Sequence, residues 1–191
     1  MKCQRCKNDS EISYLENHIC KSCFVKMLEK RIRKYLRVNE IVHKGDKLIL
    51  VGSMSEFWIN RIFTGLPLKT YRYADKGHYF DDKTLLAKAK ALKARIVIPW
   101  TMDHENKYFL QNFVEGSKQA HLGESELFVK ILKPITDQEA RILSDIRHLK
   151  YKPIFEDRYS KLFNTLEQKY DSVRYAFASS VDEMVKVLKK H

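Results

Sequence analysis

The chain has 191 residues, enough for one ordinary domain with a small appendage, and 44% of them are hydrophobic, so it can bury a core. No apolar run approaches the ~20 residues that a membrane span needs, which argues against a membrane protein. The net charge of +12 favours a polyanionic partner, most commonly nucleic acid, with solubility or an acidic protein partner as alternatives. The polar N-terminus is unlike a signal peptide, so we expect a cytoplasmic protein.

All four cysteines lie near the N-terminus, in two Cys-x-x-Cys pairs: Cys3 with Cys6 and Cys20 with Cys23. Two such pairs at this separation are typical of a structural zinc site with four thiolate ligands. Two disulfides are the alternative without a metal, but thiols of cytosolic proteins stay reduced. An iron–sulfur cluster also accepts four thiolates, and it remains the second candidate. The sequence therefore predicts a zinc ribbon-like module that depends on its metal to fold.

A basic amphipathic helix is expected to follow the second cysteine pair. Apolar residues from Phe24 to Leu36 recur at helical spacing. The other faces carry six cations within twelve residues and only Glu29 against them. A solvated helix face is the ordinary explanation, but this density favours phosphate contacts. The residues expected to contact nucleic acid are Lys30, Arg31, Arg33, Lys34 and Arg37.

The rest of the chain alternates between strand and helix patterns, which predicts an α/β fold with a parallel sheet and crossover helices. Strands are expected at 48–51, 66–73, 94–99 and 128–134, and helices at 81–93, 103–114 and 159–169. Capping boxes are expected at Thr136-x-x-Glu139 and at Ser180-x-x-Glu183. The only plausible boundary lies near residues 38–46. It separates a zinc-plus-helix module (1–40) from an α/β domain (41–191).

The corner after the first strand of the α/β domain is where such folds cradle phosphate on glycine-rich loops. Here it reads Ser53-Met54-Ser55-Glu56. Met54 has a side chain where close backbone approach needs glycine. Ser53-x-x-Glu56 also has the form of a capping box, and the Glu56 carboxylate would repel phosphate. The sequence therefore predicts a nucleotide corner that has been filled in and binds no ATP.

Several stretches resemble, in order, the tRNA 2-thiouridine synthetases, which are N-type ATP pyrophosphatases. The cysteine pairs, the basic helix and "GDKLILVGS" are similar to the start of that family, and "GLPLKTYRY" to its next strand. "ARIVIPWTMDHENKYFLQNFVEG" resembles its strand, "GHNxDD" loop and helix, ending in "NxxxG". "KPITDQEARILSDIRHLKY" and "FNTLEQKYDSVRYAFASS" resemble its later segments. The resemblance implies a reduced sheet of the adenine-nucleotide-hydrolase type.

The family's catalytic groups are missing where the resemblance would place them. Of its phosphate loop "SGGxDS" only Ser53 remains, and of the aspartates of "GHNxDD" only Asp103. Its cysteine pair for sulfur or cluster chemistry falls in "YADKGHYFDD" and its third cysteine in "FEDRYS", and neither segment contains cysteine. A strand–helix unit of the adenine site is also missing between Thr64 and Gly65. We therefore expect no catalytic residue, no ATP and no iron–sulfur cluster.

This pattern favours a degenerate, non-catalytic subunit, like the second subunit of the cytoplasmic tRNA 2-thiolation complex. It would contribute tRNA binding and stabilise a catalytic paralogue in a heteromer. One alternative is a free-standing zinc-containing RNA- or DNA-binding protein, in which exposed aromatics stack on bases. Its candidate residues are Tyr71, Tyr73, Tyr79 and Phe80, beside Arg72, Lys76 and His78.

A second alternative is an enzyme whose site has moved elsewhere in the chain. Its candidate acid–base or metal-binding residues are His43, His78, His104, Asp81, Asp82 and Asp103. Scattered histidines and paired aspartates at a helix start are more often surface and capping residues, so this alternative ranks below the others.

Overall fold

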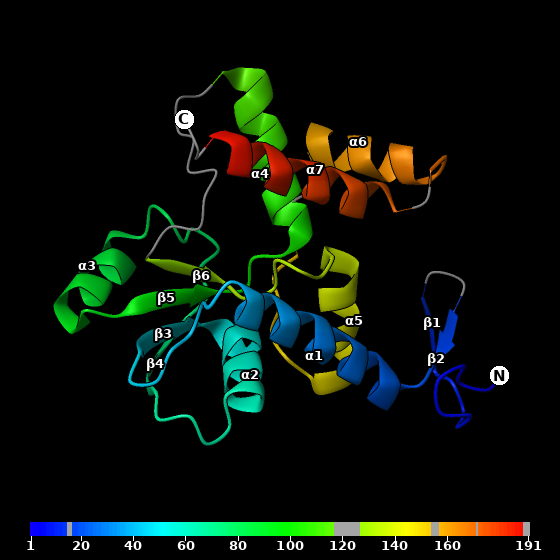
Figure 1. The fold of residues 1–191 in the computed structure, drawn as a ribbon, viewed down its shortest axis with the longest axis horizontal. Coiled ribbons are helices and arrows are strands. Elements are labelled where there is room, and N and C mark those ends of the chain that lie inside the picture. The colour runs from blue at the N-terminus through cyan, green and yellow to red at the C-terminus, as the bar shows by residue number, and fades with distance from the viewer. Residues whose placement is uncertain (15–16, 117–126, 154–156, 171, 189–191) are drawn as a thin grey trace.

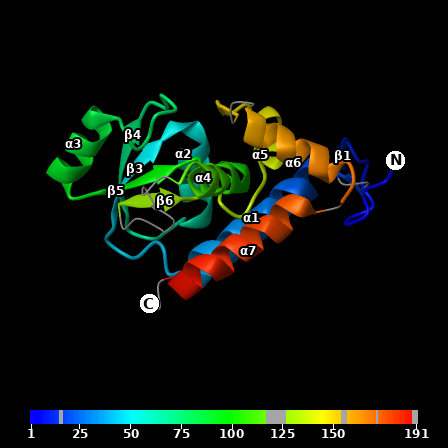
Figure 2. The same ribbon diagram turned by 90° about the horizontal axis from the view of Figure 1, so that it is seen from above.

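A computed structural model describes residues 1–14, 17–116, 127–153, 157–170 and 172–188. A short antiparallel hairpin of β1 (Ile12–Tyr14) and β2 (Asn17–Ile19) opens the chain and leads directly into the long helix α1 (Lys21–Val38). The hairpin and the N-terminus lie at one end of the molecule and the main sheet at the other, with α1 running between them (Figures 1 and 2).

The main sheet has four strands in the order β4-β3-β5-β6, and every neighbouring pair is parallel. Crossover helices join the strands in sequence, as the alternation of patterns predicts. The elements are β3 (Lys47–Val51), α2 (Gly52–Ile62), β4 (Lys69–Tyr73), α3 (Lys83–Leu92), β5 (Arg95–Ile98), α4 (Met102–Glu115) and β6 (Phe128–Lys130). This confirms the expected α/β fold class with an N-terminal four-cysteine module.

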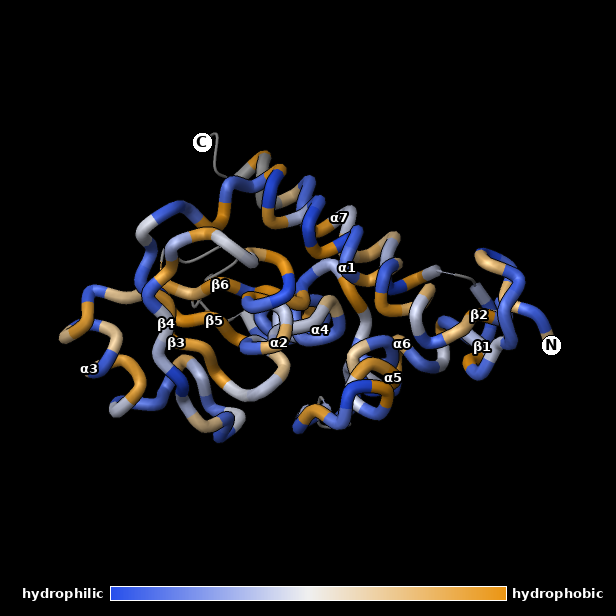
Figure 3. Tube along the Cα trace, turned by 90° about the horizontal axis from the view of Figure 1, so that it is seen from below, coloured by the Kyte–Doolittle hydropathy of each residue, from blue (hydrophilic) through white to orange (hydrophobic). Residues whose placement is uncertain are grey.

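The sheet is covered on both faces, which is why its inner strands read as continuous apolar runs. Leu48 and Leu50 of β3 face a core that includes the buried sides of α1 and α2, whereas Ile49 and Val51 face a second core that includes α3. Figure 3 shows β3, β5 and β6 as mostly hydrophobic, whereas α1 alternates between polar and apolar residues. The helix α1 thus shares one core with the sheet, although the expected boundary at 38–46 does fall in the connection between them.

Three further helices complete the fold: α5 (Asp137–Arg147), α6 (Arg158–Glu167) and α7 (Val173–Leu188). The capping box at Thr136 and Glu139 opens α5, as expected. The second expected box is wrong, because Ser180 lies inside α7 and its hydroxyl donates to the carbonyl of Ala176. Helices α6 and α7 pack with α4 around the rings of Phe109, Phe163 and Phe177. No helix in the described part of the chain is long and apolar enough to cross a bilayer.

Candidate metal centre and nucleic-acid interface

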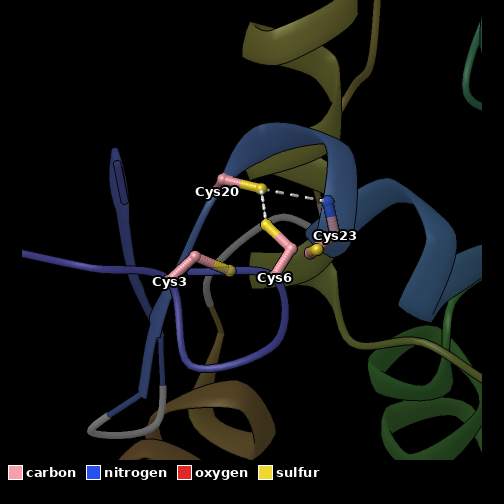
Figure 4. Close-up of side chains that lie close together, drawn as sticks. All are labelled: Cys3, Cys6, Cys20 and Cys23. Atoms are coloured by element: carbon pink, nitrogen blue, oxygen red, sulfur yellow. Dashed lines mark hydrogen bonds between the residues drawn. The ribbon is translucent and has the colours of Figure 1, made fainter. Parts of the chain in front are cut away.

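The four cysteines converge on one point at the N-terminal end of the molecule. Their sulfur atoms all lie within 4.8 Å of one another. Cys3 and Cys6 come from the first loop, whereas Cys20 and Cys23 flank the start of α1 (Figure 4). The cluster therefore has the ligand set for a metal ion, as the two Cys-x-x-Cys pairs predict.

The backbone around the cluster already stabilises negative charge on sulfur. Cys20 is the N-cap of α1, and its Sγ accepts the backbone N–H of Cys23 at 3.4 Å. A hydrogen bond from the backbone of Cys20 is the main reason that the pKa of the Cys3 thiol falls to about 6. The other thiols of the cluster make a second ionisation harder. The hydrogen bond with Cys6 is the main reason that the pKa of the Cys23 thiol rises to about 12. A bound cation would relieve this competition by accepting all four thiolates, with release of protons.

A basic groove runs along α1 and past the end of α2. It has a volume of about 1250 Å³. Six of its lining residues are cations and only Glu29 and Glu40 are acids; the cations are Lys26, Lys30, Arg33, Lys34, Arg37 and Arg61. The groove thus adds Lys26 and Arg61 to the expected set. The sequence could not single out Arg61, since nothing in it says that the end of α2 packs against α1.

The cations of the groove divide into two groups. Arg33 donates to Glu29 at 2.9 Å. It also donates to the backbone carbonyls of Ile62 and Arg61, which lie at the C-terminal end of α2. Arg61 donates to the other oxygen of Glu29 at 2.7 Å. Burial favours the neutral acid, but the bonds from the two arginines hold the pKa of Glu29 below its usual value. These three side chains form one bonded cluster in which two guanidinium groups share a single carboxylate.

The other four cations that line the groove lie outside this cluster. Lys26, Lys30, Lys34 and Arg37 are exposed, and none makes an ion pair or hydrogen bond with another side chain in the described ranges. Their spacing of four, four and three residues places them on one face of α1. A row of unpaired cations on one helix face is suited to contact a phosphate backbone.

Arg31 faces away from this row. Its guanidinium pairs with the fully buried Glu139 of α5 and donates to the hydroxyl of Tyr175 of α7 at 2.8 Å. The sequence pattern groups Arg31 with the other helix cations, because any charged residue near an exposed stripe looks solvent-facing before its neighbours are known. Its contacts instead join α1, α5 and α7.

The corner after β3 lies where the strand order reverses, between β3 and β5, which is the usual ligand position in open parallel sheets. The chain turns at Gly52, whose φ is +72°. Ser53 Oγ accepts the backbone N–H of Lys150 at 2.8 Å and donates to its carbonyl at 3.2 Å. Met54 is fully buried. The segment at Lys150 therefore packs onto the corner.

The capping box expected at this corner is wrong. No side chain caps the first turn of α2, because the Ser53 hydroxyl is used by Lys150. Ser55 is buried, and Glu56 pairs instead with Arg72 of β4. The first turn of α2 therefore holds no acidic residue, and the carboxylate expected to repel phosphate there is paired one turn further on.

The residues considered for a relocated active site are held in structural contacts or lie on the surface. Asp103 is bonded by Arg174 and by the backbone N–H of Asp137, and burial raises its pKa. Burial lowers the pKa of His104 to about 4, and its Nδ1 forms part of the cap of α4. Asp82 caps α3, whereas His43, His78 and Asp81 are exposed.

The aromatic residues considered for base stacking are mostly packed against the protein. Tyr79 is buried and meets Trp100 edge to face, and Phe80 packs on both Trp100 and Phe128. Tyr71 and Tyr73 lie half-buried on the edge strand β4. This region is therefore less open to a nucleic-acid strand than the groove along α1.

No protein-family model matches the sequence, and no curated protein matches it. Among solved structures, the fold is similar to that of the U34-tRNA thiolase NcsA from Methanococcus maripaludis with its 4Fe-4S cluster. The superposition covers 97% of this chain and 88% of that chain, with a TM-score of 0.75 and 16% identity. The fold is thiolase-like. At this identity the likeness extends to the architecture alone.

Proposed function

We propose that this chain is a non-catalytic subunit of a tRNA uridine 2-thiolation complex. In this proposal it binds tRNA along α1 and stabilises an active pyrophosphatase paralogue in a heteromer. The observation that carries it is the row of four cations on α1 that have no partner among the described residues, in a protein with a thiolase-like fold. A partner with its own basic surface would tighten tRNA binding further, since two linked sites act together.

The structure of the corner after β3 supports the non-catalytic role in this proposal. Ser53 is bonded to the backbone of Lys150, and the buried Met54 stands where the phosphate loop of the resembled family has glycine. The four cysteines lie together at the other end of the molecule from the sheet (Figure 1). A sulfur-carrying cysteine beside the strand ends is therefore missing from this arrangement.

We propose that the four thiolates hold a structural zinc ion. Zinc–sulfur bonds of ~2.3 Å place the sulfurs of a tetrahedral site about 3.8 Å apart. The Cys6 and Cys20 sulfurs are 3.5 Å apart, and all four lie within 4.8 Å, which fits one ion better than a wider four-iron cluster. Zinc here would fix the first loop against the start of α1, since Cys3 and Cys6 come from that loop and Cys20 and Cys23 from the helix end.

ATP is expected not to bind at the corner after β3 at millimolar concentration, because the Lys150 backbone occupies the Ser53 hydroxyl and Met54 replaces a glycine that would let phosphate approach. Calorimetric titration of the purified chain with ATP and Mg²⁺ checks this, with an ATP-binding thiolase titrated in parallel as the positive control. Saturable binding that is lost in a Ser53→Ala variant would contradict the filled-corner interpretation.

Changing Lys30, Lys34 and Arg37 to alanine together is expected to weaken tRNA binding without altering the melting temperature, because all three are exposed and make no ion pair with any residue that the structure describes. Each lost phosphate contact lowers the log–log salt slope by about 0.7–0.9, so the triple variant should lose about 2–3 from its slope. The matched control changes three exposed lysines elsewhere, Lys83, Lys90 and Lys161, and should bind nearly as the parent does. Unchanged affinity and slope in the first variant would show that α1 is only a solvated face.

A further inference from the structure

One face of α2 carries a second row of side chains that begins where the groove along α1 ends. Ser53, Phe57 and Arg61 follow one another at steps of four residues, which places them on the same side of the helix. Arg61 is already part of the groove wall. The row therefore leads from the groove back to the corner after β3.

The end of α5 and the loop after it supply positive charge along this row. Arg147 of α5 lies over the Phe57 ring, 5.9 Å from its centroid, and Arg61 lies 6.0 Å from the same centroid. Lys150 is held beside Ser53 through its backbone, which leaves its side chain exposed. Arg61, Arg147 and Lys150 thus follow one another along α2.

The two glutamates that contact or belong to this part of α2 are already paired. Glu29 is shared between Arg33 and Arg61, and Glu56 pairs with Arg72. Arg147 and Lys150 are exposed and have no carboxylate partner in the described part of the chain. A guanidinium over an aromatic ring keeps its N–H donors available at its edge. The Phe57 ring therefore positions Arg147 with its N–H donors open to phosphate, beside Arg61, which donates to Glu29 through Nε.

We infer that Arg147 and Lys150 form a second phosphate-binding segment beside Phe57 and Arg61, which continues the RNA path from α1 along α2 to the filled corner. This inference rests on the proposed function, since it takes RNA as the polyanion. At a rise of 1.5 Å per residue, the α1 row from Lys26 to Arg37 extends about 16 Å, and the α2 face from Ser53 to Arg61 adds about 12 Å. A strand that keeps helical stacking advances ~3.4 Å per nucleotide, so it needs about five nucleotides for the first segment and about four more for the second.

The test compares two RNAs on two double variants of the metal-loaded full chain. In Arg147→Glu with Lys150→Glu, tRNA affinity is expected to fall at least tenfold and the salt slope by about 1.4–1.8 for two lost contacts. A five-nucleotide single strand, which the α1 row can bind alone, should lose less than threefold. The control variant Lys83→Glu with Lys90→Glu makes the same charge change on α3 and should leave both affinities within threefold.

The outcomes separate this inference from the proposed function. Equal tRNA losses in the two double variants would overturn the inference, because only net charge would then matter. The inference fails, and the proposed function stands, if Arg147→Glu with Lys150→Glu leaves tRNA affinity unchanged while the Lys30, Lys34 and Arg37 triple variant loses tRNA affinity. If the glutamate variant melts early, Arg147→Gln with Lys150→Gln removes the charge alone and should give the same tRNA-specific loss.

Discussion

Replacing Arg31 with alanine is expected to destabilise the folded chain by roughly 3–5 kcal/mol, the cost typical of leaving one partner of a buried ion pair alone. The Glu139 side chain is 0% exposed and Arg31 is its only cationic partner in the described part of the chain. Glu139 also accepts the backbone N–H of Thr136 at 2.9 Å and the Tyr175 hydroxyl at 3.3 Å. Without Arg31, this carboxylate keeps its hydrogen bonds but loses its counter-charge.

Urea denaturation of the variant and the parent measures this effect, and Lys30→Ala is the matched control. Lys30 is the neighbouring exposed cation, so its loss should change the free energy of unfolding by no more than about 0.5 kcal/mol. Pairing Arg31→Met with Glu139→Gln should recover much of the stability, because no buried charge then remains. If Arg31→Ala unfolds at the same urea concentration as Lys30→Ala, the buried pair does not join the three helices.

Removing the metal is expected to have the second large effect on folding, which is confined to the N-terminal part of the chain. Structural zinc sites supply about 10–16 kcal/mol of apparent binding energy, most of which is folding energy in so small a module. Cys3, Cys20 and Ile19 are buried in the same core as α1, and Tyr14 meets the Phe24 ring edge to face at 5.8 Å. Loss of the ion should therefore disorder residues 1–23 and loosen the first turns of α1.

Hydrogen exchange on the parent and on Cys6→Ser measures this loss directly, alongside metal analysis of both proteins. The parent should contain about one zinc per chain and show no iron–sulfur absorption. The variant should lose exchange protection in the N-terminal module and keep it in β3 and β5, which pair with each other and also contact the second core on the other face of the sheet. Iron in place of zinc would contradict the zinc assignment, and unchanged protection in Cys6→Ser would contradict a structural role for the ion.

The elements of the fold could be predicted from the sequence because their signals are local. The helix from Lys21 to Val38 follows the spacing of its apolar residues, and α5 begins at the capping box of Thr136 and Glu139. The cysteine cluster follows from the spacing of its two pairs, which carry most of the information about that site. The parallel sheet follows from the alternation of strand and helix patterns.

The contacts between distant elements could not be predicted in the same way. Ser53 and Glu56 have the sequence form of a cap, but Ser53 meets the Lys150 backbone, 97 residues away, and Glu56 meets Arg72. Arg31 looks like one more surface cation until α5 and α7 are placed beside it. A helical pattern gives the direction in which a side chain points, whereas its partner depends on which element packs there.

The salt dependence of tRNA binding by the metal-loaded full chain tests the account most directly. The account predicts saturable binding to unmodified tRNA with a log–log slope of about −3 or steeper. Each of the four α1 cations that are unpaired within the described ranges would neutralise one phosphate and contribute ~0.7–0.9 to the slope. A chain that binds no tRNA at low salt, or that binds it with a slope near zero, would contradict the account.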